Sequence, residues 1–142
     1  MGLTHIDDHG DAVMVDISNK PEQKRTARAQ AIVHMNEETV RLLQAGLLKK
    51  GNALAVGRIA GIQAAKMTAQ LIPLCHNIRI DGVGVDFEIR KDSIVVTTTA
   101  TCRAATGIEM EALTAASMAS LAIYDMCKAV DKTMRITDIV LL

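Results

Sequence analysis

The two ends of one apolar segment carry charged residues whose types and spacing could do acid–base chemistry. Asp125 and Lys128 lie three residues apart near its end, so a helix would place them on neighbouring surface, where they can form an ion pair. Their neighbours are Leu, Ala, Ile and Met, which predicts a low-dielectric setting in which both pKa values shift and both groups transfer protons. A plain ion pair is the alternative.

Glu109, Met110 and Glu111 stand near the start of the same segment. Carboxylates in the first turn of a helix are ordinary partners of the helix dipole. The free backbone N–H groups at that end can instead receive the polar edge of a ligand, and a carboxylate can accept two N–H groups from a guanine-like ring. The residues alone leave both interpretations open.

A short loop around Pro73 is the second candidate site. Pro73 fixes its own backbone and disfavours helix before it, so the loop that carries Leu74, Cys75 and His76 is stiff. A histidine on a stiff loop suits ligand recognition or proton transfer. The alternative is a partly buried histidine whose hydrogen bonds are made within the protein and which has no role in function. Cys75 is expected to serve only in packing.

Basic residues suggest a phosphate site. Arg25 lies at the end of a polar run, Asn19 to Arg25, that is expected to be a loop, and Lys50 lies beside Gly51. Both could reach triphosphate oxygens, the arginine through two parallel hydrogen bonds and the lysine as a point charge. An ordinary solvated surface is the alternative for each.

One long helix over residues 107–129 must position the charged pairs. Glu111 and Asp125 are fourteen residues apart, about 21 Å along the axis at about 1.5 Å per residue. Fourteen steps of about 100° return within about 40° of the start, so both lie roughly on one face. A small ligand could hardly touch both from one chain. Either the ligand is long or neighbouring subunits complete two sites, and we favour the intersubunit site.

The rest of the pattern predicts a single α+β domain over residues 1–142. Gly57 and Gly61 indicate a helix face that something approaches closely, and tight packing is the better explanation. The expected fold is a ferredoxin-like β-α-β-β-α-β core, an antiparallel sheet with helices packed on one face, plus an extra N-terminal strand and helix. The expected elements are strands at 12–18 and 27–35, a helix capped by Asn36 and ended by Gly46 or Gly51, a helix over about 52–71, a hairpin of 78–90 and 93–103 around Lys91-Asp92, the long helix, and a strand at 134–142.

Composition excludes several classes of function. Phe87 and Tyr124 are the only aromatic residues and the net charge is zero, which disfavours a ferredoxin-like RNA-binding domain and nucleic-acid partners in general. Three widely spaced cysteines without a Cys-x-x-Cys pair argue against a metal site. Reduced thiols, with no long apolar span, predict a cytoplasmic protein without a membrane partner.

Three long motifs carry a resemblance to a known family. They are Leu71-Ile-Pro-Leu-Cys-His76, Thr106-Gly-Ile-Glu-Met-Glu-Ala-Leu-Thr-Ala-Ala-Ser117 and Tyr124-Asp-Met-Cys-Lys-Ala129. Shorter matches are Leu3-Thr4-His5, Val15-Asp16-Ile17-Ser18 with Lys20 and Arg25, and Ala60-Gly61-Ile62-Gln63-Ala64-Ala65-Lys66. Over essentially its whole length the chain closely resembles the molybdenum cofactor biosynthesis protein C family, the cyclic pyranopterin monophosphate synthase accessory protein.

The resemblance implies a lyase that converts 3′,8-cyclo-7,8-dihydroguanosine 5′-triphosphate to cyclic pyranopterin monophosphate and releases pyrophosphate. It also implies a hexamer made of three dimers, with active sites at subunit interfaces. Carried over by motif, Asp125 is the acid/base and Lys128 and Lys50 are catalytic lysines. The resemblance further implies substrate contacts from Leu74, Cys75, His76, Met110 and Glu111, phosphate contacts from Lys20 and Arg25, and support from Glu109.

The residue types suit this reaction. Closing a cyclic phosphate needs a base near the attacking sugar hydroxyl and cations on the leaving group, and rebuilding the ring needs several proton donors and acceptors. We expect no resident cofactor or metal, with Mg²⁺ entering only on the triphosphate. The alternative is a non-catalytic module that binds a pterin or nucleotide or scaffolds the pathway, which would not need both Asp125 and Lys128.

The chain departs from the family's pattern in two places. Cys102-Arg103-Ala104-Ala105 lacks the lysine that many relatives carry just before Thr-Gly. Relatives usually continue past the last strand into a tail rich in Gly, Ser and Lys whose lysine reaches the site, whereas the printed sequence stops at Leu142. We expect full activity to depend on such a tail.

Overall fold

A four-stranded sheet and four helices make up the fold in the computed structural model, which describes residues 2 and 4–142. Leu3, part of one quoted match, lies outside the described residues. In chain order the elements are β1 (Gln23–His34), α1 (Glu37–Gln44), α2 (Ala53–Lys66), α3 (Thr68–Leu71), β2 (Gly82–Ile89), β3 (Ser93–Ala104), α4 (Glu109–Cys127) and β4 (Arg135–Leu141).

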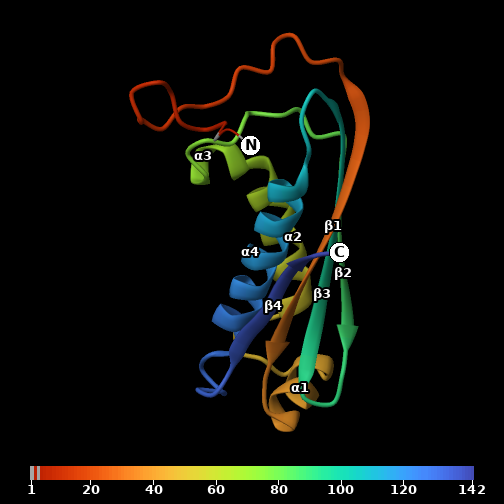
Figure 1. The fold of residues 1–142 in the computed structure, drawn as a ribbon. Coiled ribbons are helices and arrows are strands. Elements are labelled where there is room, and N and C mark those ends of the chain that lie inside the picture. The colour runs from red at the N-terminus through yellow and green to blue at the C-terminus, as the bar shows by residue number, and fades with distance from the viewer. Residues whose placement is uncertain (1, 3) are drawn as a thin grey trace.

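The strands lie in the order β2-β3-β1-β4, and every neighbouring pair is antiparallel. The two long helices, α2 and α4, run side by side over one face of the sheet (Figure 1). β1, α2, β2, β3, α4 and β4 therefore form the predicted ferredoxin-like β-α-β-β-α-β core, and α1 and α3 are additions to it. The predicted fold class is confirmed.

Alternation along the two central strands decides which face of the sheet carries the helices. On β1 the buried residues Ala29, Ala31 and Val33 alternate with more exposed neighbours, and β3 repeats this pattern from Val96 to Ala104. The alanines leave room for α4, and the buried Thr98 hydroxyl donates to the Ala112 carbonyl at 2.7 Å. α4 is thus held against the middle of the sheet.

Two glycines set the distance between α2 and α4. A Cβ on Gly57 would lie 3.0 Å from Ile123 Cγ1, and a Cβ on Gly61 would lie 3.1 Å from the Ala115 carbonyl oxygen. Such contacts are closer than ordinary van der Waals separation, so a side chain at either position would push the helices apart. The predicted tight packing of this face is confirmed.

Some local expectations were wrong. Residues 12–18 form no strand: an isolated bridge joins Ile6 to Ala12, and the Val15 carbonyl accepts a hydrogen bond from His76 instead of a strand partner. The expected loop at Asn19 to Arg25 ends earlier, because β1 begins at Gln23. The predicted helix 52–71 is interrupted at Met67, and the first hairpin strand begins at Gly82 rather than 78.

The connection after α1 positions Lys50, one of the predicted site residues. α1 begins after Asn36, as its acidic first turn suggested, and ends at Gln44. Asn36 holds the N-cap position, but its side chain makes no capping hydrogen bond. Gly46 and Gly51 then both adopt positive φ, at 70° and 102°, which only glycine accepts without strain. The chain between them turns back so that Lys50 reaches α4. None of the helices in the described residues is long and apolar enough to cross a membrane.

Candidate active site

Three charged side chains converge at the C-terminal end of α4. Lys128 Nζ lies 2.9 Å from Asp125 Oδ1, and Lys50 Nζ lies 3.1 Å from Asp125 Oδ2. Lys50 also donates to the backbone oxygen of Asp125 at 3.1 Å. The carboxylate is therefore held between two ammonium groups, one on its own helix and one from the loop between α1 and α2. The sequence predicted the first pair but not the second.

This charged cluster is open to water in the single chain. The side chains of Lys50, Asp125 and Lys128 are 43%, 55% and 53% exposed, so the predicted low-dielectric setting is wrong for the chain by itself. Hydrogen bonds from Lys128 and Lys50 lower the pKa of Asp125, and its carboxylate in turn raises the pKa of Lys128. Asp125 and Lys128 therefore keep their charges at neutral pH.

A small cavity lies at the N-terminal end of α4. Its volume is about 150 Å³, and it is lined by His5, Leu74, Cys75, His76, Ile78, Thr106, Gly107, Glu109, Met110 and Glu111. The loop after Pro73 and the start of α4 meet here. The structure thus brings six of the predicted substrate-binding residues into one place, although they belong to segments more than thirty residues apart.

Glu111 is the chemically unusual residue of this cavity. It is only 4% exposed, and burial raises the pKa of its carboxyl group, with the charge of Glu109 adding to the effect. Burial, with the carboxylate of Glu111, also raises the pKa of Cys75, so this thiol stays protonated. Glu111 can therefore hold a proton at a pH where an ordinary glutamate has lost it.

His76 is oriented by a single hydrogen bond. Its Nε2 lies within hydrogen-bonding distance of the Val15 carbonyl oxygen, which can only accept. Nε2 therefore carries a proton, and in the neutral form of the ring Nδ1 is left as an acceptor. The segment around Val15 is thus used to fix the tautomer of a cavity residue.

A second, larger cavity adjoins the first and shares His76, Ile78 and Thr106 with it. Its volume is about 320 Å³, and its lining includes Lys20, Arg79 and Arg103. The sequence analysis missed both arginines. Their position was the available signal, because Arg79 follows the His76 loop closely and Arg103 shortly precedes Thr106-Gly107.

Comparison with known proteins concerns the sequence of both ends of α4. Residues 14–142, which include the three long motifs, match the MoaC family. The chain belongs to the MoaC family.

Three relatives show how far this similarity extends. The chain is 49% identical over its whole length to a cyclic pyranopterin monophosphate synthase of Peptoclostridium acidaminophilum, covering 90% of that protein. It is 52% identical to the synthase of Clostridium perfringens strain 13, with 96% of this chain and 88% of the relative aligned. It is 50% identical to cyclic pyranopterin monophosphate synthase 1 of Mycobacterium bovis, over 99% of this chain and 84% of the relative.

Arg25 of this MoaC-family chain lies on β1, not on the predicted loop. Its Nε donates to the Ala104 carbonyl at 3.1 Å, and an Nη donates to the Ala105 carbonyl at 3.4 Å. The guanidinium therefore braces the connection between β3 and α4, which forms one wall of the larger cavity. Three of the five N–H donors of an arginine remain for a ligand.

Asp131 is a buried carboxylate that the sequence analysis missed. It is 2% exposed and accepts hydrogen bonds from the Asn36 N–H at 2.8 Å, the Thr39 hydroxyl at 2.9 Å and both the N–H and hydroxyl of Thr133. Burial alone would raise its pKa, but these bonds outweigh burial and the pKa is lowered. Asp131 joins the start of α1 to the connection between α4 and β4.

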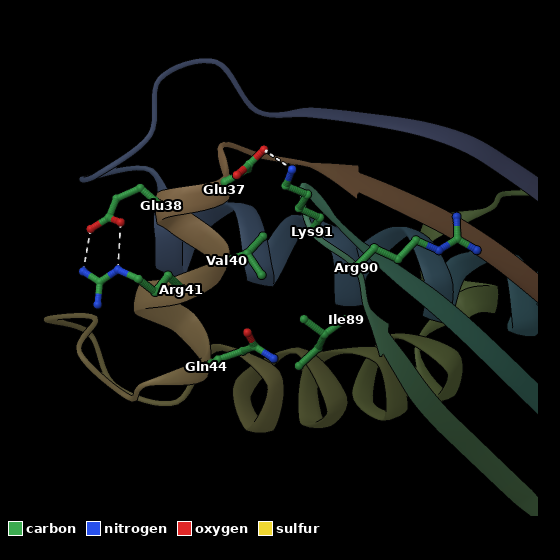
Figure 2. A pocket seen from close by; sticks show the side chains of 8 residues that line it. All are labelled: Glu37, Glu38, Val40, Arg41, Gln44, Ile89, Arg90 and Lys91. Atoms are coloured by element: carbon green, nitrogen blue, oxygen red, sulfur yellow. Dashed lines mark hydrogen bonds and ion pairs between the residues drawn. The ribbon is translucent and has the colours of Figure 1, made fainter.

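A further hollow of about 500 Å³ lies between α1 and the β2–β3 turn (Figure 2). Four of its five charged side chains are paired with one another at the surface, Glu38 with Arg41 at 2.6 Å and Glu37 with Lys91 at 3.3 Å. It contains none of the predicted site residues, so it is not the candidate site. Among the residues described, no three His, Cys, Asp or Glu side chains are arranged to hold a metal ion.

Proposed function

We propose that this chain converts 3′,8-cyclo-7,8-dihydroguanosine 5′-triphosphate to cyclic pyranopterin monophosphate and pyrophosphate, as a phosphorus–oxygen lyase of molybdenum cofactor biosynthesis. The observation that carries the proposal is the convergence of Lys50 on the Asp125–Lys128 pair, with contacts of 3.1 and 2.9 Å. Two ammonium groups around one carboxylate are the set that phosphate cyclisation needs. The names of the relatives described above support the same step.

The chemistry of the cyclisation assigns a role to each group. A sugar hydroxyl attacks the α-phosphorus, a new P–O bond forms, and the bond to the bridging oxygen breaks so that pyrophosphate leaves with its electron pair. Asp125, whose lowered pKa keeps it ionised, takes the hydroxyl proton. Lys128, whose pKa is raised, stays cationic and stabilises charge on the leaving group together with Lys50.

The cavity at the other end of α4 suits the ring-forming part of the substrate. Glu111 offers a buried carboxyl group that can donate or accept a proton, and His76 offers Nδ1 as an acceptor. Leu74, Cys75 and Met110 supply an apolar wall, while Glu109 raises the pKa of Glu111. In the adjoining cavity Lys20 would hold phosphate oxygens. Arg25 does not line this cavity but bonds to its wall at Ala104 and Ala105, and its remaining donors would assist from there.

The assembly is part of the proposal. Glu111 and Asp125 lie on one continuous helix, so about 21 Å of axis separates them. A single compact substrate cannot bridge that distance, and we propose that the working form is a cytoplasmic hexamer, a trimer of dimers, whose subunits share each site. We propose no resident cofactor, with Mg²⁺ carried by the triphosphate.

The test is turnover by the purified chain. The cyclised triphosphate is supplied with Mg²⁺, and the products are measured as released pyrophosphate and, after oxidation, as a fluorescent pterin. We expect both products in equal amounts, and neither from Asp125→Asn, the matched control that keeps side-chain shape. Binding of the substrate without either product would overturn the catalytic assignment and favour a non-catalytic binding module.

A further inference from the structure

Residues 5–13 form a small hairpin, called here the N-terminal hairpin, and this hairpin places His5. An isolated antiparallel bridge joins Ile6 to Ala12, and the Val13 N–H donates to the His5 carbonyl oxygen at 2.9 Å. Figure 1 shows this part of the chain in red, at the end of the molecule where α3 and the start of α4 lie. The hydrogen bond uses the His5 backbone and not its imidazole ring.

The turn of the N-terminal hairpin is closed by its own residues. Asp7 Oδ1 accepts hydrogen bonds from the His9 N–H at 2.9 Å and from the Asp11 N–H at 3.0 Å. An aspartate that bonds to the backbone two residues further on is a common way to build a turn. Gly10 completes the turn with a φ of 87°. These bonds give the hairpin a shape of its own.

His76 ties the N-terminal hairpin to the cavity at the start of α4. Its Nε2 bonds to the Val15 carbonyl oxygen, and Val15 lies only two residues after Val13, which bonds to His5. The first residues of a domain keep a fixed position only where such contacts hold them. The two histidines therefore hold successive parts of one short segment, and both line the cavity of about 150 Å³.

His5 lies on the solvent side of this cavity. It is an exposed residue, whereas Glu111 in the same lining is only 4% exposed. The other titratable residues of the lining are Cys75, His76 and Glu109. Because the cavity is small, a ring that fills it would meet groups on the buried side and on the solvent side together.

We propose that His5 is a third proton-transferring residue of the cavity and contacts the ring-forming part of the substrate from the solvent side. The inference rests on the proposed function, which gives proton transfer in this cavity to Glu111 and His76 only. In this step the neutral imidazole takes a proton from an N–H or hydroxyl group of the substrate and becomes imidazolium. It later gives that proton to another substrate atom, so nothing is oxidised or reduced and no further reactant is needed.

The three groups differ in what they can do. Burial raises the pKa of Glu111, which suits that carboxyl group to donate a proton, and His76 offers Nδ1 as an acceptor. An imidazole can both take and give a proton near neutral pH. Because His5 is exposed, its ring can also exchange protons with water. A reaction that adds and removes protons at several ring atoms needs a group of this kind.

Two histidines of the same hairpin provide a matched test. His5→Asn removes the ring at the cavity, and the control His9→Asn removes a ring at the exposed turn. We expect kcat to fall about 10²-fold in His5→Asn, the lower end of the usual contribution of a general acid or base, and to stay native in His9→Asn. KM should change much less than kcat in His5→Asn, and the two melting temperatures should be equal.

Two further measurements separate proton transfer from a structural role of the hairpin. The pH profile of kcat should change its shape in His5→Asn, and added imidazole should restore part of the turnover of His5→Gly, because free imidazole can enter the space that the ring leaves. A structural role would change neither result in this way. Near-native kcat in His5→Asn, or a low kcat with an unchanged pH profile and no rescue of His5→Gly, would overturn the inference.

Ring-proton NMR tests the contact without using activity. The chain has four histidines, His5, His9, His34 and His76, so single variants can assign each ring signal. The cyclised triphosphate is added at saturation to Asp125→Asn, which under the proposed function binds this substrate without converting it. We expect the ring signals of His5 and His76 to shift and those of His9 and His34 to stay.

The outcomes distinguish this inference from the proposed function. A shift of the His76 signal without a shift of the His5 signal would overturn the inference and leave the proposed function standing. A shift of the His5 signal, with no pyrophosphate released by the native chain, would support the contact and overturn the proposed function. If neither signal shifted, the inference would be overturned, and turnover by the native chain would decide the proposed function by itself.

Discussion

At the N-terminal end of α4 Glu111 is buried in a cavity wall and its pKa is raised, whereas at the C-terminal end Asp125 is half exposed between two lysines and its pKa is lowered. The two carboxylates sit on one helix and face nearly the same way. Their different surroundings suit them to different proton transfers. Glu111 is suited to carry a proton to or from a substrate ring, and Asp125 is suited to remain an anion that accepts a proton.

The largest expected effect comes from the C-terminal end. Asp125→Asn or Lys128→Ala should lower single-turnover product formation by about 10²- to 10⁴-fold, the usual contribution of a general acid or base. The melting temperature should hardly change, because the pair is exposed. Near-native product formation by either variant would show that this end of α4 is not where the chemistry occurs.

A substitution of Asp131, near the same end of α4, should affect stability rather than turnover. Asp131→Ala would leave the Asn36 N–H and the Thr39 and Thr133 groups without their acceptor, so we expect a loss of about 2–4 kcal/mol in unfolding free energy. Below its melting temperature the variant should retain most of its turnover. Denaturant melts measure the first effect, with Lys132→Ala, an exposed neighbour, as the control.

Asp131 also gives stability a dependence on pH. Its folded-state pKa is lowered, so its contribution is present above the unfolded-state pKa and is lost as the pH falls through the folded-state value. The native chain should therefore lose stability in acid more steeply than Asp131→Asn. If the two proteins lost unfolding free energy equally as the pH fell, this account of the Asp131 carboxylate would be contradicted.

At the N-terminal end, Glu111→Gln should lower kcat/KM by about 10- to 100-fold, the cost of losing a hydrogen bond to an ionisable partner. Because the carboxyl titrates at a raised pKa, the pH profile of kcat should lose one limb in this variant. A simple packing role for Glu111 would leave the shape of that profile unchanged, and the comparison of the two profiles decides between them.

The smallest effect concerns stability at the same residue. A buried carboxyl with a raised pKa costs stability when it is ionised, so this cost is complete above the folded-state pKa and absent below the unfolded-state pKa. Glu111→Gln should therefore melt slightly higher than the native chain at neutral pH, and the gap should close in acid. If the difference in melting temperature between the two proteins widened in acid, the raised pKa of Glu111 would be wrong.

Periodicity was sufficient for most of the fold. α4, the turn of the β2–β3 hairpin at Lys91 and Asp92, and the acidic start of α1 are local patterns, and each formed at or within two residues of the predicted position. The 12–18 segment shows where such reasoning ends. Its alternation suits a strand, but a strand needs a partner edge, and the Val15 carbonyl is taken by His76.

The site was only partly predictable for a related reason. Glu109, Glu111, Asp125 and Lys128 stand out because charge is unusual in an apolar helix. The contact between Lys50 and Asp125 joins residues 75 positions apart, and no local pattern contains it. Arg79, Arg103 and the buried Asp131 likewise depend on which segments meet in the folded chain.

Tyr124 gives the C-terminal end of α4 a spectroscopic signal of its own. It is half-buried, it immediately precedes Asp125, and it is the only tyrosine in a chain without tryptophan. Nearly all ultraviolet emission of the protein therefore comes from one side chain beside the charged cluster. Without any label, the intensity and anisotropy of that emission should report ligand arrival or subunit contact at this end alone, against a dark background from the rest of the molecule.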